Sequence, residues 1–263
     1  MSDPRASRRR AALAVTEPVR AAASFGALAA GLPLLRLAPR GDAHPVLVLP
    51  GLMAGDLSTG TLRRWLRGLG YPVVGWELGR NRGPTPEVVV GLPALVERLA
   101  REHGTAVSIV GQSLGGIFAR RLAMRSPHQV RQVITLGSPF APAGRGAGDT
   151  PAARLYRSFA PMHAANRIHS ARGVGRSLPV PSTSVYSRWD GVVDWRACLQ
   201  PVTATSENVG VRAAHLGMGH DPAVLWVVAD RLAQSRDGWR PFRRPTRFGL
   251  GALFPAEDDA PST

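Results

Sequence analysis

Two kinds of hydrophobic pattern alternate along residues 43–235. Short apolar runs that end in Gly or Pro are typical of buried strands, whereas apolar residues at every third or fourth position are typical of helices. The runs that predict strands lie in 44–52, 71–78, 106–110, 130–139, 177–187 and 206–211. The periodic stretches that predict helices are 61–70, 86–104 with a bend near Pro93, 114–126 and 222–234. This alternation predicts an α/β fold, with a mostly parallel sheet covered by helices on both faces.

The pattern also divides the chain. Residues 1–42 precede the alternation and predict an N-terminal helical extension, and residues 43–235 form the predicted α/β domain. Within that domain, residues 140–176 carry Gly- and Pro-rich flanks around a helical segment, which is typical of a cap or lid insertion. Residues 236–263 are rich in Arg and Pro and then acidic, and they predict a flexible C-terminal tail.

The segment Ala21–Leu35 is uncharged and follows several arginines. A secretory signal is disfavoured because Glu17, Pro18 and Arg20 interrupt the approach and no clear cleavage site follows. The segment is also too short and too rich in glycine for a spanning helix, which needs about 20 apolar residues. We expect a helix that packs on the domain and borders either the active site or a membrane surface. The expected location is therefore cytoplasmic, with a peripheral membrane contact through this segment as an open alternative.

Composition excludes several kinds of chemistry. All 33 basic residues are arginine, so a Walker A loop and Schiff-base catalysis, which both need lysine, are excluded. The formal net charge is +15, but the arginines are dispersed and no nucleic-acid-binding motif is present, so no specific nucleic-acid partner is expected. The single cysteine, Cys198, cannot form an internal disulfide, and no zinc-ligand spacing occurs. We expect neither a metal nor a cofactor, and the oligomeric state cannot be read from these features.

Residues 111–115, Gly-Gln-Ser-Leu-Gly, fit the G-x-S-x-G pattern between a predicted strand and a predicted helix. At such a turn a serine is exposed at the end of the strand, and the glycines keep strand and helix from colliding. The helix N-terminus also aims amide groups at negative charge that develops nearby. The sequence therefore predicts Ser113 as a nucleophile, with an ordinary glycine-rich turn as the alternative.

A nucleophilic serine needs a base, and the base needs an acid that orients it. Asp190 and His215 each follow a predicted strand, so they are expected at the same edge of the sheet as Ser113. Asp194 is the alternative acid, and His220 is the alternative base. His220 is disfavoured because it adjoins Asp221-Pro222, which looks like a helix N-cap and first helical residue.

These motifs resemble the α/β-hydrolase superfamily in its lipase/esterase branch. The matching segments, which span most of residues 43–235, are LVLPGL (47–52), GQSLGG (111–116), ITLGSPF (134–140), YSRWDGVV (186–193) and ENVGVRAAHLGMG (207–219). The resemblance implies the α/β-hydrolase fold, with Ser113 as nucleophile, Asp190 as acid and His215 as base. It also implies a structural role for Ser138, which likewise follows a strand.

The resemblance further implies an oxyanion hole of two backbone amides. Leu114, directly after the nucleophile, would supply one, and Leu52 in the turn after the first core strand would supply the other, with Met53 in reserve. The chain departs from the family pattern at Pro50, where some lipases carry His, and at Gln112, where His is commoner before the nucleophile. Neither change removes an amide of the predicted hole.

Together these features predict a serine hydrolase that cleaves carboxylic esters through an acyl-enzyme. The substrate would be a small-molecule ester or an acyl lipid, because apolar loop residues such as Leu52 and Leu216 would suit an acyl chain. One alternative is an acyltransferase with the same triad, although no H-x-x-x-x-D motif is present. The other is a binding protein of this fold without catalysis.

Overall fold

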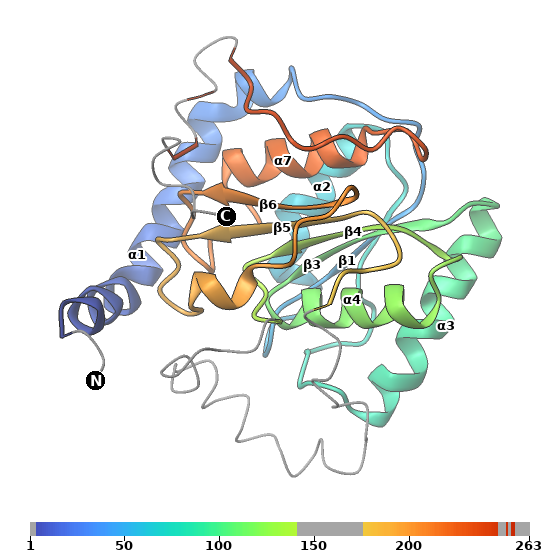
Figure 1. The fold of residues 1–263 in the computed structure, drawn as a ribbon, viewed down its shortest axis with the longest axis horizontal. Helices are drawn as coiled ribbons and strands as arrows, with labels where there is room; N and C mark the ends of the chain where they lie inside the picture. Colours follow the sequence, from blue (N-terminus) through green and yellow to red (C-terminus); the bar gives the residue numbers. More distant parts are fainter. Residues whose placement is uncertain (1–3, 141–175, 247–250, 252–253, 256–263) are drawn as a thin grey trace.

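The computed structural model describes residues 4–140, 176–246, 251 and 254–255. Its six strands form one sheet in the order β2-β1-β3-β4-β5-β6, and all five pairings are parallel (Figure 1). The strands are β1 (Val46–Leu49), β2 (Val73–Val74), β3 (Val107–Gln112), β4 (Val130–Leu136), β5 (Ser182–Ser187) and β6 (Ser206–Val211). The predicted α/β fold with a parallel sheet is confirmed.

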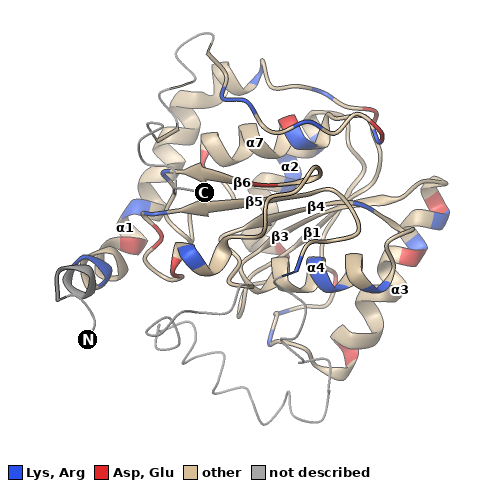
Figure 2. Ribbon diagram, in the orientation of Figure 1, with Lys and Arg blue, Asp and Glu red and all other residues tan. Residues whose placement is uncertain are grey.

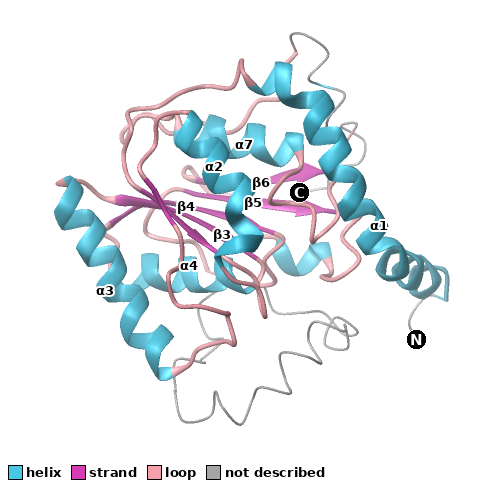
Figure 3. Cartoon of the chain, turned by 180° about the vertical axis from the view of Figure 1, so that it is seen from behind, coloured by secondary structure: helices cyan, strands magenta, loops and turns pink. Residues whose placement is uncertain are grey.

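Helices cover both faces of the sheet. They are α1 (Pro4–Leu35), α2 (Gly60–Gly68), α3 (Pro86–His103), α4 (Leu114–Arg125) and α7 (Pro222–Leu232), with short 3-10 turns η1 (Asp56–Thr59) and η3 (Trp195–Cys198). Helices α2 and α7 lie on one face, and α3 and α4 lie on the other; the view from behind shows the same layers (Figure 3). Parallel strands need such crossover helices, which explains the alternation along the chain.

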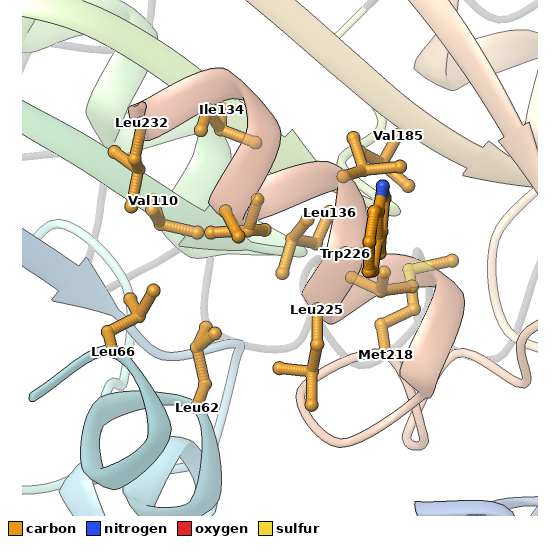
Figure 4. Packing of buried hydrophobic residues seen from close by; sticks show 14 of the residues in the cluster. Leu62, Leu66, Val110, Ile134, Leu136, Val185, Met218, Leu225, Trp226 and Leu232 are labelled. Carbon is orange, nitrogen blue, oxygen red and sulfur yellow. The ribbon is translucent and has the colours of Figure 1, made fainter. Parts of the chain in front are cut away.

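Each face of the sheet has its own hydrophobic core. Neighbouring residues of β3 point to opposite faces, so Val110 packs in one cluster and Ile109 in the other. In the first cluster Val110 lies with Leu66 of α2 and Leu225 of α7 (Figure 4). Because both faces are buried, the central strands read as continuous apolar runs rather than as alternating ones.

Strand β2 is much shorter than the stretch 71–78 predicted from sequence. The carboxylate of Asp56 accepts hydrogen bonds from the backbone amides of Trp76 (2.8 Å) and Glu77 (3.1 Å). These two amides are therefore diverted from the sheet ladder, and pairing with β1 stops after Val74. The prediction of a longer strand was wrong because a side chain distant in sequence competes for its hydrogen bonds.

The regions on either side of the predicted domain contact it. Helix α1 packs against α7. Its covered positions recur every three or four residues along one face, namely Glu17, Ala21, Ser24, the half-buried Leu28, Gly31 and Leu35. After residue 235, the amide of Phe242 donates to the carboxylate of Glu207 on β6 (2.6 Å). The boundaries at residues 42 and 235 stay predictions.

The cap predicted at 140–176 falls almost entirely on residues 141–175, which lie outside the described residues. The residues at its two ends meet on α4. The guanidinium of Arg120 lies 4.0 Å from the centre of the Phe140 ring and donates to the backbone oxygen of Arg176 at 2.5 Å. Arg120 is itself almost fully buried.

Candidate active site

Ser113 lies between the end of β3 and the start of α4, at the carboxyl edge of the central strands. Its backbone has φ 52 and ψ −120, a positive φ that residues with a side chain rarely adopt. Its amide donates to the oxygen of Leu136 on β4 (2.8 Å), which ties the turn to the neighbouring strand. Strain of this kind persists only where the surroundings enforce it, and it is concentrated at functional sites.

The glycines around Ser113 are required by close packing. A Cβ at Gly111 would lie 2.5 Å from the backbone of Gly115, and one at Gly115 would come within 3.0 Å of the backbone of Leu49. A Cβ at Gly116 would likewise come within 3.0 Å of Ser138 Oγ. The glycines of the G-x-S-x-G pattern are therefore required by the close crossing of strand and helix at this turn.

The structure brings Asp190 and His215 together. His215 Nδ1 lies 2.6 Å from Asp190 Oδ2, and both side chains are buried. The second carboxylate oxygen, Oδ1, accepts from the amides of Val192 (2.8 Å) and Val193 (2.7 Å). Because a carboxylate only accepts, Nδ1 is the donor and Nε2 of His215 remains an acceptor. This is the tautomer that a general base requires.

The electrostatic surroundings favour a proton on His215. Burial alone lowers the pKa of His215, but the negative charge of Asp190 and its hydrogen bond, together with the charge of Glu17, outweigh burial. The net result is a pKa above the ordinary histidine value. An imidazole in this setting readily takes up a proton from a neighbouring hydroxyl.

Two further residues, Gln112 and Gly137, lie against the Asp190–His215 pair. The side-chain amide of Gln112, the residue before Ser113, donates to the backbone oxygen of His215 (3.0 Å). Gly137, at φ 57 after β4, faces the pair so closely that a Cβ would lie 3.1 Å from His215 Nδ1 and 3.2 Å from Asp190 Oδ2. Sequence reasoning missed Gly137, although a glycine directly after a strand was a signal.

The turn after β1 lies against Ser113 and offers the predicted oxyanion amides. A Cβ on Gly51 would lie 3.3 Å from Ser113 Cβ. The amide of Met53 is already used, since it donates to the oxygen of Asn81 (2.7 Å). Within the described part of the chain, the amides of Leu52 and Leu114 donate to no partner. The geometry therefore favours Leu52 over Met53.

Asn81 is a residue that sequence reasoning missed. It is fully buried, and its side-chain amide donates to the oxygen of Pro50 (2.8 Å) while its backbone oxygen accepts from Met53. It thereby fixes the turn that carries Leu52. Its segment, GRNRGP (79–84), gave no sequence signal beyond that of an ordinary polar loop.

The alternative residues have other partners. Asp194 caps η3 by accepting from the amide of Arg196 (3.0 Å) and pairs with Arg10 (3.3 Å). His220 Nε2 lies 3.0 Å from the oxygen of Ala21 on α1. Ser138 is fully buried behind the serine turn, with Oγ 3.4 Å from the oxygen of Gly111.

A Ser–His–Asp hydrogen-bond chain of other residues lies at the amino end of the strands. His44 Nδ1 lies 2.6 Å from Asp42 Oδ1, and His44 Nε2 lies 2.6 Å from Ser108 Oγ. Ser108 is fully buried inside the sheet, so no substrate reaches it. Arg131 completes this cluster with an ion pair to Asp42 (2.8 Å). Among the described residues, no group of three or more His, Cys, Asp or Glu side chains is placed to hold a metal ion.

No protein-family model matches the chain, and no curated protein matches it in sequence. Solved structures do match. Aspergillus fumigatus lipase B superposes with a TM-score of 0.55 at 16% identity, over 84% of this chain and 62% of the lipase. The chain thus spans less than two thirds of that enzyme's length.

Two further structures have comparable similarity. The thermophilic carboxylesterase EstE1, cloned from a metagenomic library, gives a TM-score of 0.56 at 16% identity over 77% of this chain and 82% of EstE1. The mature form of Bacillus licheniformis lipase BlEst2 gives 0.50 at 16% identity over 74% and 94%. The chain has the α/β-hydrolase fold, as the sequence motifs implied.

Proposed function

We propose that this protein is a serine hydrolase that cleaves carboxylic esters. The observation that carries the proposal is the buried 2.6 Å hydrogen bond between Asp190 and His215, at the same sheet edge as the strained turn of Ser113. The lipases and the carboxylesterase that share the fold support ester hydrolysis as the reaction class. Ser113 would be the nucleophile, His215 the base and Asp190 the orienting acid.

In the first half of the reaction, Ser113 Oγ attacks the ester carbonyl carbon while its proton passes to His215 Nε2. The carbonyl oxygen becomes an oxyanion, which the amides of Leu52 and Leu114 stabilise. Asp190 holds the imidazolium in place through Nδ1 and offsets its charge. The bond to the alcohol oxygen then breaks, this oxygen takes the proton from Nε2, and the acyl group stays on Ser113.

In the second half, a water molecule gives its proton to His215 Nε2 and attacks the acyl carbon. The second oxyanion collapses, the bond to Ser113 Oγ breaks, and Oγ regains the proton from Nε2. The carboxylic acid leaves, and the enzyme returns to its starting state. No cofactor takes part in these steps.

A fluorophosphonate probe and a series of p-nitrophenyl esters of rising acyl length test this proposal. We expect covalent labelling at Ser113 and turnover that depends on acyl length. A protein that is neither labelled nor active would instead be a non-catalytic binding member of the fold. Product analysis with added alcohol separates hydrolysis from acyl transfer, because a transferase yields a new ester in place of the free acid.

A further inference from the structure

Helix α1 places a buried carboxylate against two loops, the one that carries Asp190 (the acid loop) and the one that carries His215 (the base loop). This carboxylate belongs to Glu17, which lies about half-way along the helix and is only 3% exposed. Its Oε2 accepts from the amide of Gly191 (3.0 Å), the residue after Asp190. Its Oε1 accepts from the amide of Leu216 (2.8 Å), the residue after His215. One side chain thus bonds to the acid loop and to the base loop at the same time.

The contact is reinforced on both sides of Asp190. Arg20, one turn along α1, pairs with Glu17 Oε2 (2.9 Å) and donates to the oxygen of Trp189 (2.5 Å). The peptides before and after Asp190 are therefore both held by α1. A Cβ at Gly191 would come within 3.0 Å of the backbone of Leu13, so helix and loop approach as closely as glycine allows.

We infer that Glu17 is a positioning residue for the Asp190–His215 pair, and that α1 is part of the catalytic architecture. This inference rests on the proposed function. Glu17 reaches the reacting groups only through the two backbone amides, and these fix the loops on which the acid and the base are carried. Misplacement of a catalytic group by about 1 Å costs on the order of 100-fold in rate, so such fixation matters.

Glu17 also acts on His215 through its charge. The charged groups that face His215 are Asp190 from the acid loop and Glu17 from α1, and both raise the pKa of His215 against the effect of burial. Arg20 lies behind Glu17, and His220 bonds away from the site to α1. Removal of the Glu17 charge should therefore lower the pKa of His215 and extend activity to more acidic pH.

The experiment compares Glu17→Gln and Glu17→Ala with Glu207→Gln as matched control. Glu207 is also a buried carboxylate that accepts a backbone amide, but it binds the C-terminal region at Phe242. For each variant we would measure kcat and KM from about pH 5 to about pH 9, thermal unfolding, and the titration of His215 by NMR with labelled histidine.

We expect Glu17→Gln to lower kcat about tenfold with KM near the wild-type value, and to shift the acid limb of the pH profile to lower pH. Glu17→Ala should lower kcat further, since it removes both accepted hydrogen bonds. Glu207→Gln should lower only the unfolding temperature. A wild-type kcat and acid limb in Glu17→Gln would overturn the inference.

The NMR titration of His215 tests the inference about Glu17 independently of the proposed function, because it does not depend on ester turnover. If the wild-type protein neither turns over esters nor reacts with a fluorophosphonate, the proposed function fails. The pKa of His215 in Glu17→Gln still reports the contact, and an unchanged value would show that Glu17 does not act on His215.

A second observation on α1 carries a separate inference. The outer face of α1 exposes apolar side chains, with Val15 80%, Val19 73% and Leu32 46% exposed. Phe25 is also 54% exposed, and its ring stacks on that of His220 with the ring centroids 3.7 Å apart. From Pro18 to Leu35 the only charged residue is Arg20, and Figure 2 shows the charges of α1 gathered towards its N-terminal part. By length and composition alone, Arg9–Leu35 could cross a membrane. The most apolar window of this helix has a mean hydropathy of 1.3, and 22% of that window is buried against the protein.

We propose that this outer face binds the surface of an anionic phospholipid bilayer. Its ends carry exposed arginines at Arg9, Arg36 and Arg40, and the whole chain has a formal net charge of +15. An apolar helix face between cationic ends suits an interface of acyl chains and anionic headgroups. Leu216, beside His215, is also 55% exposed, so the base loop adds an apolar side chain next to α1.

Vesicle flotation tests this proposal without reference to activity. We expect the protein to float with vesicles that contain phosphatidylglycerol, to float less with pure phosphatidylcholine, and to detach at high salt. Val19→Asp combined with Leu32→Asp should abolish flotation. The control Leu57→Asp, at a site 98% exposed on η1, should not change it. Equal flotation of all variants would overturn the proposal. The proposal would also be overturned if light scattering showed the wild type to be a dimer and the double variant to be a monomer, because the apolar face would then bind a second copy of the chain.

Discussion

Ser113 has a backbone conformation that costs about 1–3 kcal/mol, and its neighbours hold it there. At the scale of single residues, the site consists of such enforced positions. Gly111, Gly115 and Gly116 provide room for the turn, and Gly137 provides room for the Asp190–His215 pair. Each of these glycines has a packing neighbour that a methyl group would displace, so their presence follows from the site rather than from composition.

Ser113→Ala should abolish ester turnover while the protein still folds. Loss of a triad nucleophile costs on the order of 10⁶ in turnover, because no other group forms the acyl-enzyme. Steady-state kinetics and fluorophosphonate labelling check this. Ser138→Ala is the control and should keep activity. Near-wild-type turnover in Ser113→Ala would move the nucleophile elsewhere, with Ser138 the next residue to test.

His215→Ala should resemble Ser113→Ala, whereas His220→Ala should keep most activity because His220 bonds to α1. Activity of the wild type should fall as the pH drops through the pKa of His215, since imidazolium accepts no proton. That pKa is raised, so the fall should begin above the ordinary histidine value. A pH–rate profile checks this, and a flat profile through the histidine range would contradict any histidine base.

At the scale of elements, the parallel sheet explains why distant residues meet. The turns after β3, β5 and β6 all lie at the carboxyl edge, and they carry Ser113, Asp190 and His215. The pattern of hydrophobic residues located most of these elements, because the central strands β1, β3, β4 and β5 are buried on both faces. It failed for β2, whose length Asp56 decides, and it did not reveal that α1 contacts the acid and base loops.

Arg120→Met should destabilise the protein by about 1–3 kcal/mol, because the buried side-chain oxygen of Gln200, which accepts from Arg120 at 2.6 Å, and the oxygen of Arg176 both lose their charged donor. Arg98→Met is the matched control. Arg98 forms an exposed ion pair with Glu77, and its loss should cost less than about 1 kcal/mol. Urea unfolding measures both variants. An equal and small effect would show that the contacts of Arg120 with Gln200, Arg176 and Phe140 do not stabilise the fold.

At the scale of the whole molecule, location separates two similar constellations. The chain Asp42–His44–Ser108 has both hydrogen bonds of a triad, at 2.6 Å each, yet Ser108 is sealed inside the sheet at the amino end of the strands. The proposed triad lies at the carboxyl edge, where ligands of open α/β sheets bind. We interpret the first as a structural cluster that ties the chain before β1 to β3 and, through Arg131, to β4.

Ser108→Ala should lower the free energy of unfolding and leave the activity of the folded protein unchanged. Loss of activity in a folded Ser108→Ala variant would contradict the structural interpretation. Ester turnover and urea unfolding measured on the same preparation decide between the two outcomes.

Asp42 should contribute to the pH dependence of stability. Burial raises the pKa of Asp42, but hydrogen bonds from His44 and Arg131 outweigh it and lower the pKa from 3.8 to about 2. Because the pKa of Asp42 is lower in the folded state than in the unfolded state, the ionised carboxylate stabilises the folded protein at pH values above the unfolded-state pKa. This contribution is lost as the pH falls from about 4 to about 2. Asp42→Asn should flatten the unfolding free energy in that window. An unchanged slope in urea unfolding would contradict this.

The sequence by itself determined the order of strands and helices and the chemistry expected at the turn of Ser113. Both follow from local rules. The spacing of hydrophobic residues indicates which positions of an element are buried, and a G-x-S-x-G turn needs its glycines in any surroundings. Asp190 and His215 were named as candidates for the same reason, because each follows a predicted strand. The sequence left Asp194, His220 and Met53 as open alternatives.

Only the tertiary structure decided the partners of these residues. It pairs Asp190 with His215, occupies the amide of Met53 with Asn81, and seals Ser108 inside the sheet. It also places Glu17 against Gly191 and Leu216, which lie 174 and 199 positions away in the sequence. Hydrogen bonds over such distances depend on how whole elements pack, and no local pattern of hydrophobic and polar residues carries that information.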